Sequence, residues 1–200
     1  MEDVVRRVVL ASASKTRLEV LRAAGVEAEA VASGVDEEAV EAESVRELVE
    51  ALAIGKAQAV AERVGEALVI GCDSLLELEG RGLGKPESAD QVVRWWRERR
   101  GRRGTLYTGH CLIDTGSGRR VSAVGETAVR FGSPSDAEIR AYAASEEPLW
   151  AAGAFTIDGK GGWFVERIEG DAGNVLGLSL PLLRELLGEL GISPSELWSR

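Results

Sequence analysis

The sequence predicts an α/β fold made of one domain over residues 1–200, and three observations support this prediction. Short apolar segments typical of strands alternate along the chain with longer segments that have helical periodicity. The chain contains no internal repeat, no low-complexity tract and no obvious linker. A length of 200 residues with 44% hydrophobic residues is ample for one core, and it also allows two lobes.

The first part of the chain is predicted to alternate strands and helices. Ser14 is a candidate N-cap, and Gly25 is typical of a helix end. Ser44 and Glu47 form the capping-box pattern that opens the most clearly helical segment. The expected elements are a strand over residues 4–11, a helix from Ser14 to Gly25, a strand over residues 26–33 and a helix from Ser44 towards Gly65.

The later part of the chain is predicted to add a hairpin and three helices. Ser88 and Ser135 each begin a capping-box pattern. Glycines within residues 114–118 separate two alternating segments and predict a hairpin turn. The expected elements are a helix from Ser88, strands over residues 105–114 and 121–131, a short helix from Ser135, a strand over residues 162–169 and a helix over residues 178–190.

The segment around Asp73 is the most informative part of the chain. The apolar run 68–72 is typical of a buried strand, and Asp73 follows it directly, where an unpaired charge would be costly to bury. Residues 79–82 predict a hairpin turn, which would return Lys85 to the neighbourhood of Asp73. The residues alone leave two interpretations open, a functional carboxylate–ammonium pair and a structural ion pair that closes the hairpin.

Charge and composition restrict the class of protein. A formal net charge of -9 opposes binding to phosphate backbones, so we expect no nucleic-acid partner. No apolar run is long enough to span a membrane, and the N-terminal residues lack a signal-peptide pattern, so we expect a cytoplasmic protein without a membrane partner. Cys72 and Cys111 lie in apolar runs typical of small buried thiols.

An arginine-rich segment with two tryptophans, residues 94–103, is the local exception to the acidic composition. Such a segment could stack the bases of a single strand, which would make the chain a nucleic-acid module. The favoured interpretation is a helix in which Val92 and Trp96 face the core while the arginines form a solvated face. Steeply salt-dependent binding to single strands would distinguish the first interpretation.

Two loops and one glycine-rich region are further candidates for function. Residues 10–17 form a small-residue loop before a helix, where backbone N–H groups, hydroxyls and Arg17 could hold an anion, although Ser14 could be an N-cap alone. Residues 34–38 place carboxylates after a strand, usually a solvated arrangement. Residues 148–178 contain many glycines around single aromatics, which favours tight turns against a ligand or packed backbone.

Together these segments resemble the Maf family of nucleotide pyrophosphatases, from Leu10 to about Leu190. The resemblance is closest to the broad-specificity, actinobacterial-type branch. The matching motifs are L-A-S-x-S-x-x-R at residues 10–17, the aspartate Asp73 with Lys85-Pro86, A-G-A-[YF]-x-I-x-G at residues 152–159 and N-V-x-G-L-x-L at residues 174–180. Four ordered motifs at compatible spacing are far more specific than one glycine-rich loop. The resemblance implies a mixed, curved sheet flanked by helices, with a cleft between two lobes as in inosine triphosphatases.

The resemblance also implies a reaction. A nucleoside triphosphate would be hydrolysed to a monophosphate and pyrophosphate with Mg²⁺ or Mn²⁺, and non-standard nucleotides are candidate substrates. Asp73 matches the proton acceptor, while Lys56, Lys85 and Arg17 would neutralise phosphate oxygens. Glu37 and Asp73 are the candidate metal ligands. A free aspartate has a pKa of about 3.9, so Asp73 would depend on burial or on metal-lowered water acidity.

Substrate contacts and partners follow from the same resemblance. The residues expected to bind substrate are Ser12, Ser14, Thr16, Arg17, Ser74 and Asp158. Thr16, Ser74 and Asp158 occupy the positions associated with base specificity, and they do not assign a base. Family members are often dimers, which makes a homodimer the expected assembly. The alternative function is a nucleotide-binding regulator of septum formation in cell division, which would bind without significant turnover.

Overall fold

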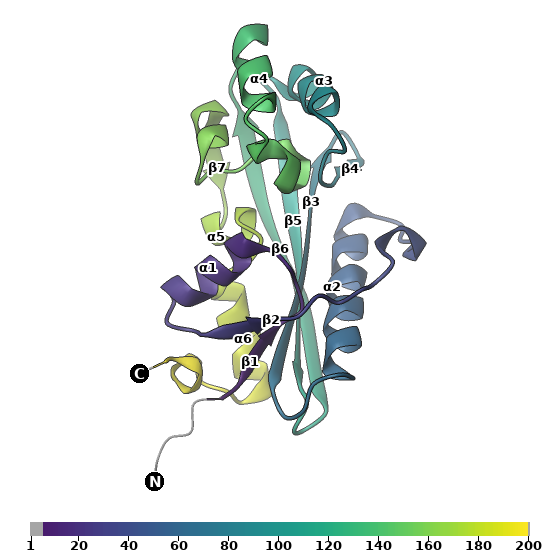
Figure 1. Cartoon of the computed structure of the whole chain (residues 1–200), viewed down its shortest axis with the longest axis vertical. Coiled ribbons are helices and arrows are strands. Elements are labelled where there is room, and N and C mark those ends of the chain that lie inside the picture. The colour runs from purple at the N-terminus through teal and green to yellow at the C-terminus, as the bar shows by residue number, and fades with distance from the viewer. Residues whose placement is uncertain (1–5, 200) are drawn as a thin grey trace.

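The computed structural model describes residues 6–199, and a seven-stranded mixed β-sheet forms its centre (Figure 1). The strands are β1 (Val8–Leu10), β2 (Ala28–Ala30), β3 (Leu68–Leu78), β4 (Arg81–Leu83), β5 (Arg103–Asp114), β6 (Arg119–Phe131) and β7 (Val165–Glu169). Their order is β2-β1-β3-β5-β6-β7, and β4 pairs with β3. β1 is parallel to β2 and β3, and the other pairs are antiparallel. The predicted mixed α/β class is therefore confirmed.

Helices cover both faces of this open sheet. They are α1 (Lys15–Ala23), α2 (Val45–Ala61), α3 (Ala89–Arg99), α4 (Asp136–Ala143), α5 (Ala172–Val175) and α6 (Leu180–Leu190). Short 3-10 turns are η1 (Glu37–Ala39), η2 (Glu147–Trp150), η3 (Ala152–Ala154), η4 (Lys160–Phe164) and η5 (Pro194–Leu197). The predicted caps Ser14, Ser44, Ser88 and Ser135 each accept a backbone N–H from the first turn. Within residues 6–199, no helix is both long and apolar enough to cross a membrane.

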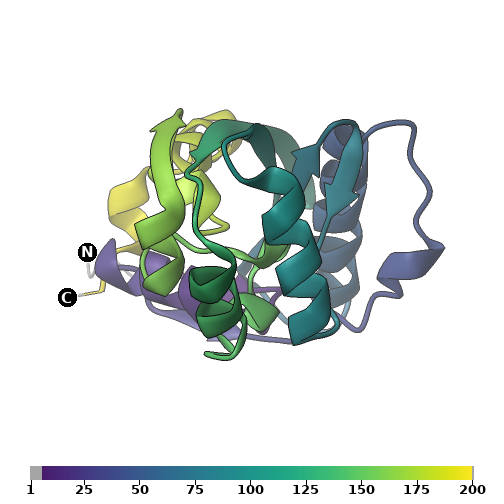
Figure 2. The same cartoon turned by 90° about the horizontal axis from the view of Figure 1, so that it is seen from above.

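The long strands β3, β5 and β6 join two lobes (Figure 1). The lower lobe contains β1, β2, α1, α2 and α6, and the upper lobe contains β4, α3, α4 and β7. In the lower lobe, α1 and α6 pack on one face of the sheet through residues such as Leu21 and Leu187, while α2 packs on the other through Ala53. The core of the upper lobe is built around Trp96 and Phe131. Seen from above (Figure 2), the segment containing η1 passes on the outer side of α2.

Between the two lobes, one edge of β3 has no paired neighbouring strand within the described residues. β1 pairs with β3 only as far as Ile70, and β4 pairs with β3 only from Leu76 onwards. On the other edge, β5 pairs with β3 continuously over residues 68–77. In the described chain, residues 71–75 therefore have a strand on one side only, and we call this stretch the β3 gap. The loops that follow β1 and β4 leave the sheet at the two ends of this gap.

Strand positions differ from the predictions in three respects, one of which is that residues 162–164, predicted as strand, belong to η4, so that β7 begins at Val165. Asp73 does not follow the end of a strand but lies within β3, opposite Gly109 of β5, because the alternating residues 74–78 continue the strand. β1 and β2 are shorter than predicted, since the chain leaves the sheet after only three paired residues in each. Residues 4 and 5 of the predicted first strand lie outside the described residues.

The tryptophan–arginine helix packs into the upper core. Trp96 is fully buried and donates its indole N–H to the carbonyl oxygen of Ala154, 2.9 Å away, so its ring is not available to stack a base. The predicted solvated arginine face is wrong at Arg99, which is also fully buried. Its guanidinium lies over the rings of Trp96 and Phe131, at 4.6 and 5.0 Å from their centroids, and these cation–π contacts explain its inward position.

Two glycines allow α2 to lie directly on the strands. A Cβ on Gly71 would be 2.3 Å from the carbonyl oxygen of Ala53, and one on Gly109 would be 2.1 Å from that of Val49. No side chain fits at either position without moving the helix. This close approach fixes the position of α2 relative to the middle of β3.

We predict that Gly109→Ala lowers the free energy of unfolding by about 1–3 kcal/mol or more, because its methyl group would overlap the backbone of α2. Urea denaturation measures the change. Gly65→Ala is the matched control, since an added Cβ there meets nothing within 4 Å and should leave stability nearly unchanged. Equal stability of both variants and the unchanged protein would contradict this packing.

The only histidine ties the sheet to α6. His110 is fully buried on β5, where its Nε2 accepts the backbone N–H of Ser179, 2.9 Å away, at the start of α6. Its Nδ1 therefore has the ring hydrogen and donates it to the carbonyl oxygen of Thr108, 3.0 Å away. Burial lowers the pKa of His110 to about 4 and keeps the ring neutral. His110 is thus a structural residue.

We predict that the protein loses stability as the pH falls from 6.5 towards 4. The pKa of His110 is about 4 in the folded state and 6.5 without these contacts, so the unfolded chain binds one more proton between these values. Stability from this group is complete above pH 6.5 and falls by at most about 1.4 kcal/mol per pH unit below it. Urea denaturation across this range tests the slope, and NMR detection of a protonated imidazole in the folded protein near pH 6 would contradict it.

Candidate active site

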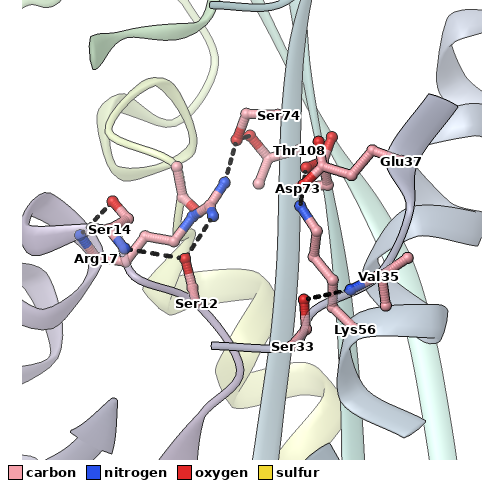
Figure 3. Close-up of polar contacts among 11 residues, drawn as sticks. Ser12, Ser14, Arg17, Ser33, Val35, Glu37, Lys56, Asp73, Ser74 and Thr108 are labelled. Carbon is pink, nitrogen blue, oxygen red and sulfur yellow. Dashed lines mark hydrogen bonds and ion pairs between the residues drawn. The ribbon is translucent and has the colours of Figure 1, made fainter. Parts of the chain in front are cut away.

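A buried lysine lies between two carboxylates at the β3 gap (Figure 3). Lys56 of α2 places its Nζ 2.6 Å from Oδ1 of Asp73 and 2.6 Å from Oε1 of Glu37. Lys56 and Asp73 are both buried, whereas the side chain of Glu37 is about half exposed. α2 supplies the lysine, β3 the aspartate, and η1 supplies Glu37. The cluster has two negative charges and one positive charge, so it can accept a further cation.

The position of Asp73 changes its acidity. Burial raises the pKa of its carboxyl group above the ordinary value, and the neighbouring ammonium of Lys56 opposes this shift. Arg17 also acts to lower the pKa of Asp73, which places its charge within electrostatic range of the carboxylate. A carboxylate with a raised pKa is a better proton acceptor near neutral pH than a free aspartate.

Arg17 is held by neutral oxygen atoms only. Its Nη1 lies 3.1 Å from Oγ of Ser12, its Nη2 lies 3.0 Å from Oγ of Ser74, and its Nε lies 2.8 Å from the carbonyl oxygen of Gly177. Among residues 6–199 this half-buried guanidinium forms no ion pair with a carboxylate. Its positive charge therefore remains available for an anion.

Arg17 and the Lys56–Asp73 pair lie on opposite faces of β3, as Figure 3 shows. Successive strand residues point to opposite sides, so Asp73 faces α2 while Ser74 faces α1 and Arg17. The β3 gap connects these two faces, because no neighbouring strand separates them there. An extended anion that lies in the gap can reach both Arg17 and the Lys56–Asp73 pair.

The prediction that Lys85 forms an ion pair with Asp73 is wrong. Lys56, rather than Lys85, is the cation on Asp73. β4 ends at Leu83, so Lys85 lies in the exposed loop beyond the paired residues, and within residues 6–199 it forms no ion pair with Asp73. Lys85 remains at the upper end of the β3 gap, where the neighbouring Gly84 accepts the backbone N–H of Gly153 at 2.8 Å.

The other predicted substrate residues lie in two places. Ser14 caps α1 and accepts the backbone N–H of Arg17 at 3.4 Å, and Thr16 is half-buried in the first turn of that helix. Asp158 is exposed in the segment between η3 and η4, where its side chain accepts a hydrogen bond from the hydroxyl of Thr156. The structure thus places Ser12, Ser14 and Arg17 together, while the contacts of Asp158 are local.

Sequence reasoning missed Thr108, which supports Arg17 through Ser74. Oγ1 of Thr108 lies 2.9 Å from Oγ of Ser74 and 2.9 Å from the carbonyl oxygen of Asn174. The carbonyl group of Gly177, which accepts from Nε of Arg17, is a further part of this support. The N-V-x-G motif marks this region, but only the pairing of β3 with β5 shows that Thr108 is opposite Ser74.

The donor set fits a hard divalent cation. Mg²⁺ typically takes one or two carboxylates, together with phosphate oxygens and water. Asp73 and Glu37 converge on one ammonium group and could supply those two carboxylates. Residues 6–199 contain no cluster of three or more acidic, histidine or cysteine side chains with metal-binding geometry, so phosphate and water would complete the coordination. A separate cavity of about 680 Å³ between α4 and η4 contains none of these residues in its lining.

The chain is similar to known proteins over nearly its whole length. Residues 7–190 match the family model "Maf-like protein". A relative from Streptomyces coelicolor is 58% identical over 196 residues, covering 97% of this chain and 95% of the relative. A relative from Salinispora tropica is 56% identical, with 97% and 88% covered, and one from Gloeothece citriformis is 47% identical, with 95% and 97% covered. All three are named "Nucleoside triphosphate pyrophosphatase".

One solved structure has a looser likeness. It is titled "The structure of the Staphylococcus aureus Ham1 protein" and aligns with a TM-score of 0.45 and 17% identity, covering 64% of this chain and 72% of the other. The family match and the relatives above are sufficient, and they show that the chain belongs to the Maf-like protein family.

Proposed function

We propose that this protein hydrolyses a nucleoside triphosphate to a nucleoside monophosphate and pyrophosphate at the β3 gap. The observation that most supports this reaction is a buried carboxylate, Asp73, that pairs with Lys56 on one face of β3, while Arg17, bonded to Ser74, lies on the other face. Relatives named as nucleoside triphosphate pyrophosphatases at 47–58% identity support the same reaction. The family resemblance makes non-standard nucleotides candidate substrates.

The proposed reaction breaks the bond between the α-phosphorus and the oxygen that bridges to the β-phosphorus. A water molecule attacks the α-phosphorus, and Asp73 accepts its proton, for which the raised pKa of this carboxyl group suits it. The bridging oxygen leaves with pyrophosphate. Arg17, Lys56 and Lys85 neutralise the charge that develops on the phosphate oxygens.

A divalent cation, Mg²⁺ or Mn²⁺, belongs to this proposal. Glu37 and Asp73 would hold it, and it would supply charge neutralisation and more acidic water. Lys56 has a second role, because its ammonium keeps the two carboxylates close together before the substrate and its cation arrive. Substituting either carboxylate should therefore weaken metal-dependent binding.

Substrate contacts in the proposal follow the geometry of the first loop. Ser12, Ser14 and Arg17 surround the start of α1, where hydroxyls, backbone N–H groups and the helix dipole favour a phosphate. Thr16, Ser74 and Asp158 remain the proposed specificity residues.

We predict pyrophosphate release from one or more members of a panel of standard and modified nucleoside triphosphates, and loss of this activity when EDTA removes the divalent cation. The measurement is coupled detection of pyrophosphate together with chromatography of the monophosphate. Release of single phosphate instead would contradict cleavage between the α- and β-phosphates. Binding without any product would favour the alternative, a regulator of septum formation.

We predict that Asp73→Asn lowers kcat by about 10²- to 10⁴-fold, the usual contribution of a general base. The change removes a charge with little change in volume, so the fold should persist, which circular dichroism checks. Asp90→Asn is the matched control, since Asp90 is exposed in the first turn of α3 and should leave kcat unchanged. A folded Asp73→Asn variant with a normal kcat would show that the proton acceptor is a different group.

A further inference from the structure

The hydroxyl of Thr108 has a fixed direction. Thr108 is fully buried on β5, in register with Ser74 of β3. Its Oγ1 is 2.9 Å from the carbonyl oxygen of Asn174, and a carbonyl oxygen can only accept a hydrogen bond. The single hydroxyl hydrogen of Thr108 therefore points to Asn174. In the 2.9 Å contact between the two hydroxyls, Ser74 must be the donor.

This direction determines what Ser74 can offer to Arg17. Because the hydroxyl hydrogen of Ser74 points to Thr108, only its lone pairs remain for other partners. Nη2 of Arg17 lies 3.0 Å away and donates to one of them. The hydrogen bonds thus run in one direction, from the guanidinium through two hydroxyls to the carbonyl group of Asn174. Reversing any one of them would place two hydrogens or two lone pairs against each other.

The hydroxyl hydrogen of Ser12, unlike that of Ser74, has no partner among residues 6–199. Its Oγ accepts from Nη1 of Arg17 and from the backbone N–H of Ser14, both at 3.1 Å. Within residues 6–199 its hydroxyl hydrogen has no acceptor, so it is available to a phosphate oxygen. The two serines that hold Arg17 are therefore not equivalent, since Ser12 can donate to an anion and Ser74 cannot without breaking its bond to Thr108.

Thr127 serves as a comparison that separates a purely structural role of Thr108 from a role in anion binding. Thr127 of β6 is also fully buried, and its hydroxyl donates to the carbonyl oxygen of Asp171 at 2.9 Å. It also accepts from Nδ2 of Asn174 at 3.2 Å. Both threonines thus hold the segment around α5 on the sheet, but of the two only Thr108 is bonded to Ser74.

We propose that Thr108 is a positioning residue for anion binding. It makes Ser74 a pure acceptor and so holds the guanidinium of Arg17 in the β3 gap, ready for a polyphosphate. Ser74 then acts on the phosphates through Arg17, and towards the base it can serve only as an acceptor. The identity of the anion rests on the proposed function, whereas the direction of the hydrogen bonds rests on the geometry alone.

Calorimetric titration with inorganic tripolyphosphate in the presence of Mg²⁺ tests this role. Thr108→Val, which keeps the shape and removes the hydroxyl, should bind about three- to tenfold more weakly, the usual effect of one lost hydrogen bond. Thr108→Ser should restore binding. Thr127→Val is the matched control and should bind within about twofold of the unchanged protein, although it removes an equally buried hydroxyl.

A double-mutant cycle with Arg17→Ala separates positioning from general damage. If Thr108 acts through Arg17, Thr108→Val should have no further effect on tripolyphosphate affinity in the Arg17→Ala background. The same loss in both backgrounds, or no loss in either, would overturn the proposal. Should Thr108→Val fail to fold, Ser74→Ala must show the same loss and the same dependence on Arg17, and normal binding by that variant would overturn the proposal equally.

The same titration distinguishes failure of the positioning role of Thr108 from failure of the proposed function. If the unchanged protein binds tripolyphosphate and releases pyrophosphate from a nucleotide while Thr108→Val behaves normally, only the positioning role falls. If the unchanged protein neither binds tripolyphosphate nor releases pyrophosphate, the proposed function itself falls.

Discussion

The site depends on a length mismatch between neighbouring strands. β3 continues to Leu78, but its parallel neighbour stops at Leu10 and β4 begins to pair only at Leu76. Five residues in the middle of the sheet, 71–75, are thereby left with one free edge. Because strand residues alternate between faces, this stretch presents Asp73 to α2 and Ser74 to α1. A complete sheet would separate these two sets of polar groups.

The charges around this gap differ from those of the whole molecule. The chain has a formal charge of -9, yet Arg17 has only neutral oxygens as partners among the described residues. Lys56 is buried between two carboxylates, an arrangement in which loss of one partner would leave a charge poorly compensated. A polyphosphate with a divalent cation complements both groups at once, since it brings negative charge to Arg17 and positive charge to the carboxylates. An acidic surface elsewhere discourages other polyanions.

Local signals in the sequence predicted the helices and the first loop well. The serine caps, the glycine turn at residues 79–82 and the Ser12–Arg17 loop each depend on residues close together in the chain, and the structure has all of them. Contacts between residues far apart in the sequence were harder to predict. Lys56 replaces Lys85 as the partner of Asp73 because Gly71 and Gly109 let α2 approach the strands, which no local pattern reveals.

Burial of polar groups was the other unpredictable feature. Arg99 lies over Trp96 of its own helix and Phe131 of the remote strand β6, so its helical position alone suggested solvent. Thr108 is joined to Asn174 across 66 residues, and its importance appears only when β3 and β5 are placed in register. The family resemblance supplied the candidate site residues, whose roles remain predictions, whereas the contact of Thr108 with Ser74 required the structure.

A crystal structure with Mg²⁺ and a nucleoside triphosphate analogue that has a methylene bridge between its α- and β-phosphates would show where the polyphosphate binds. We expect the triphosphate in the β3 gap, with one end beside Arg17 and the α-phosphate within hydrogen-bond reach of a water molecule on Asp73. A nucleotide bound elsewhere, for example in the cavity between α4 and η4, with Arg17 and Asp73 untouched, would contradict this placement.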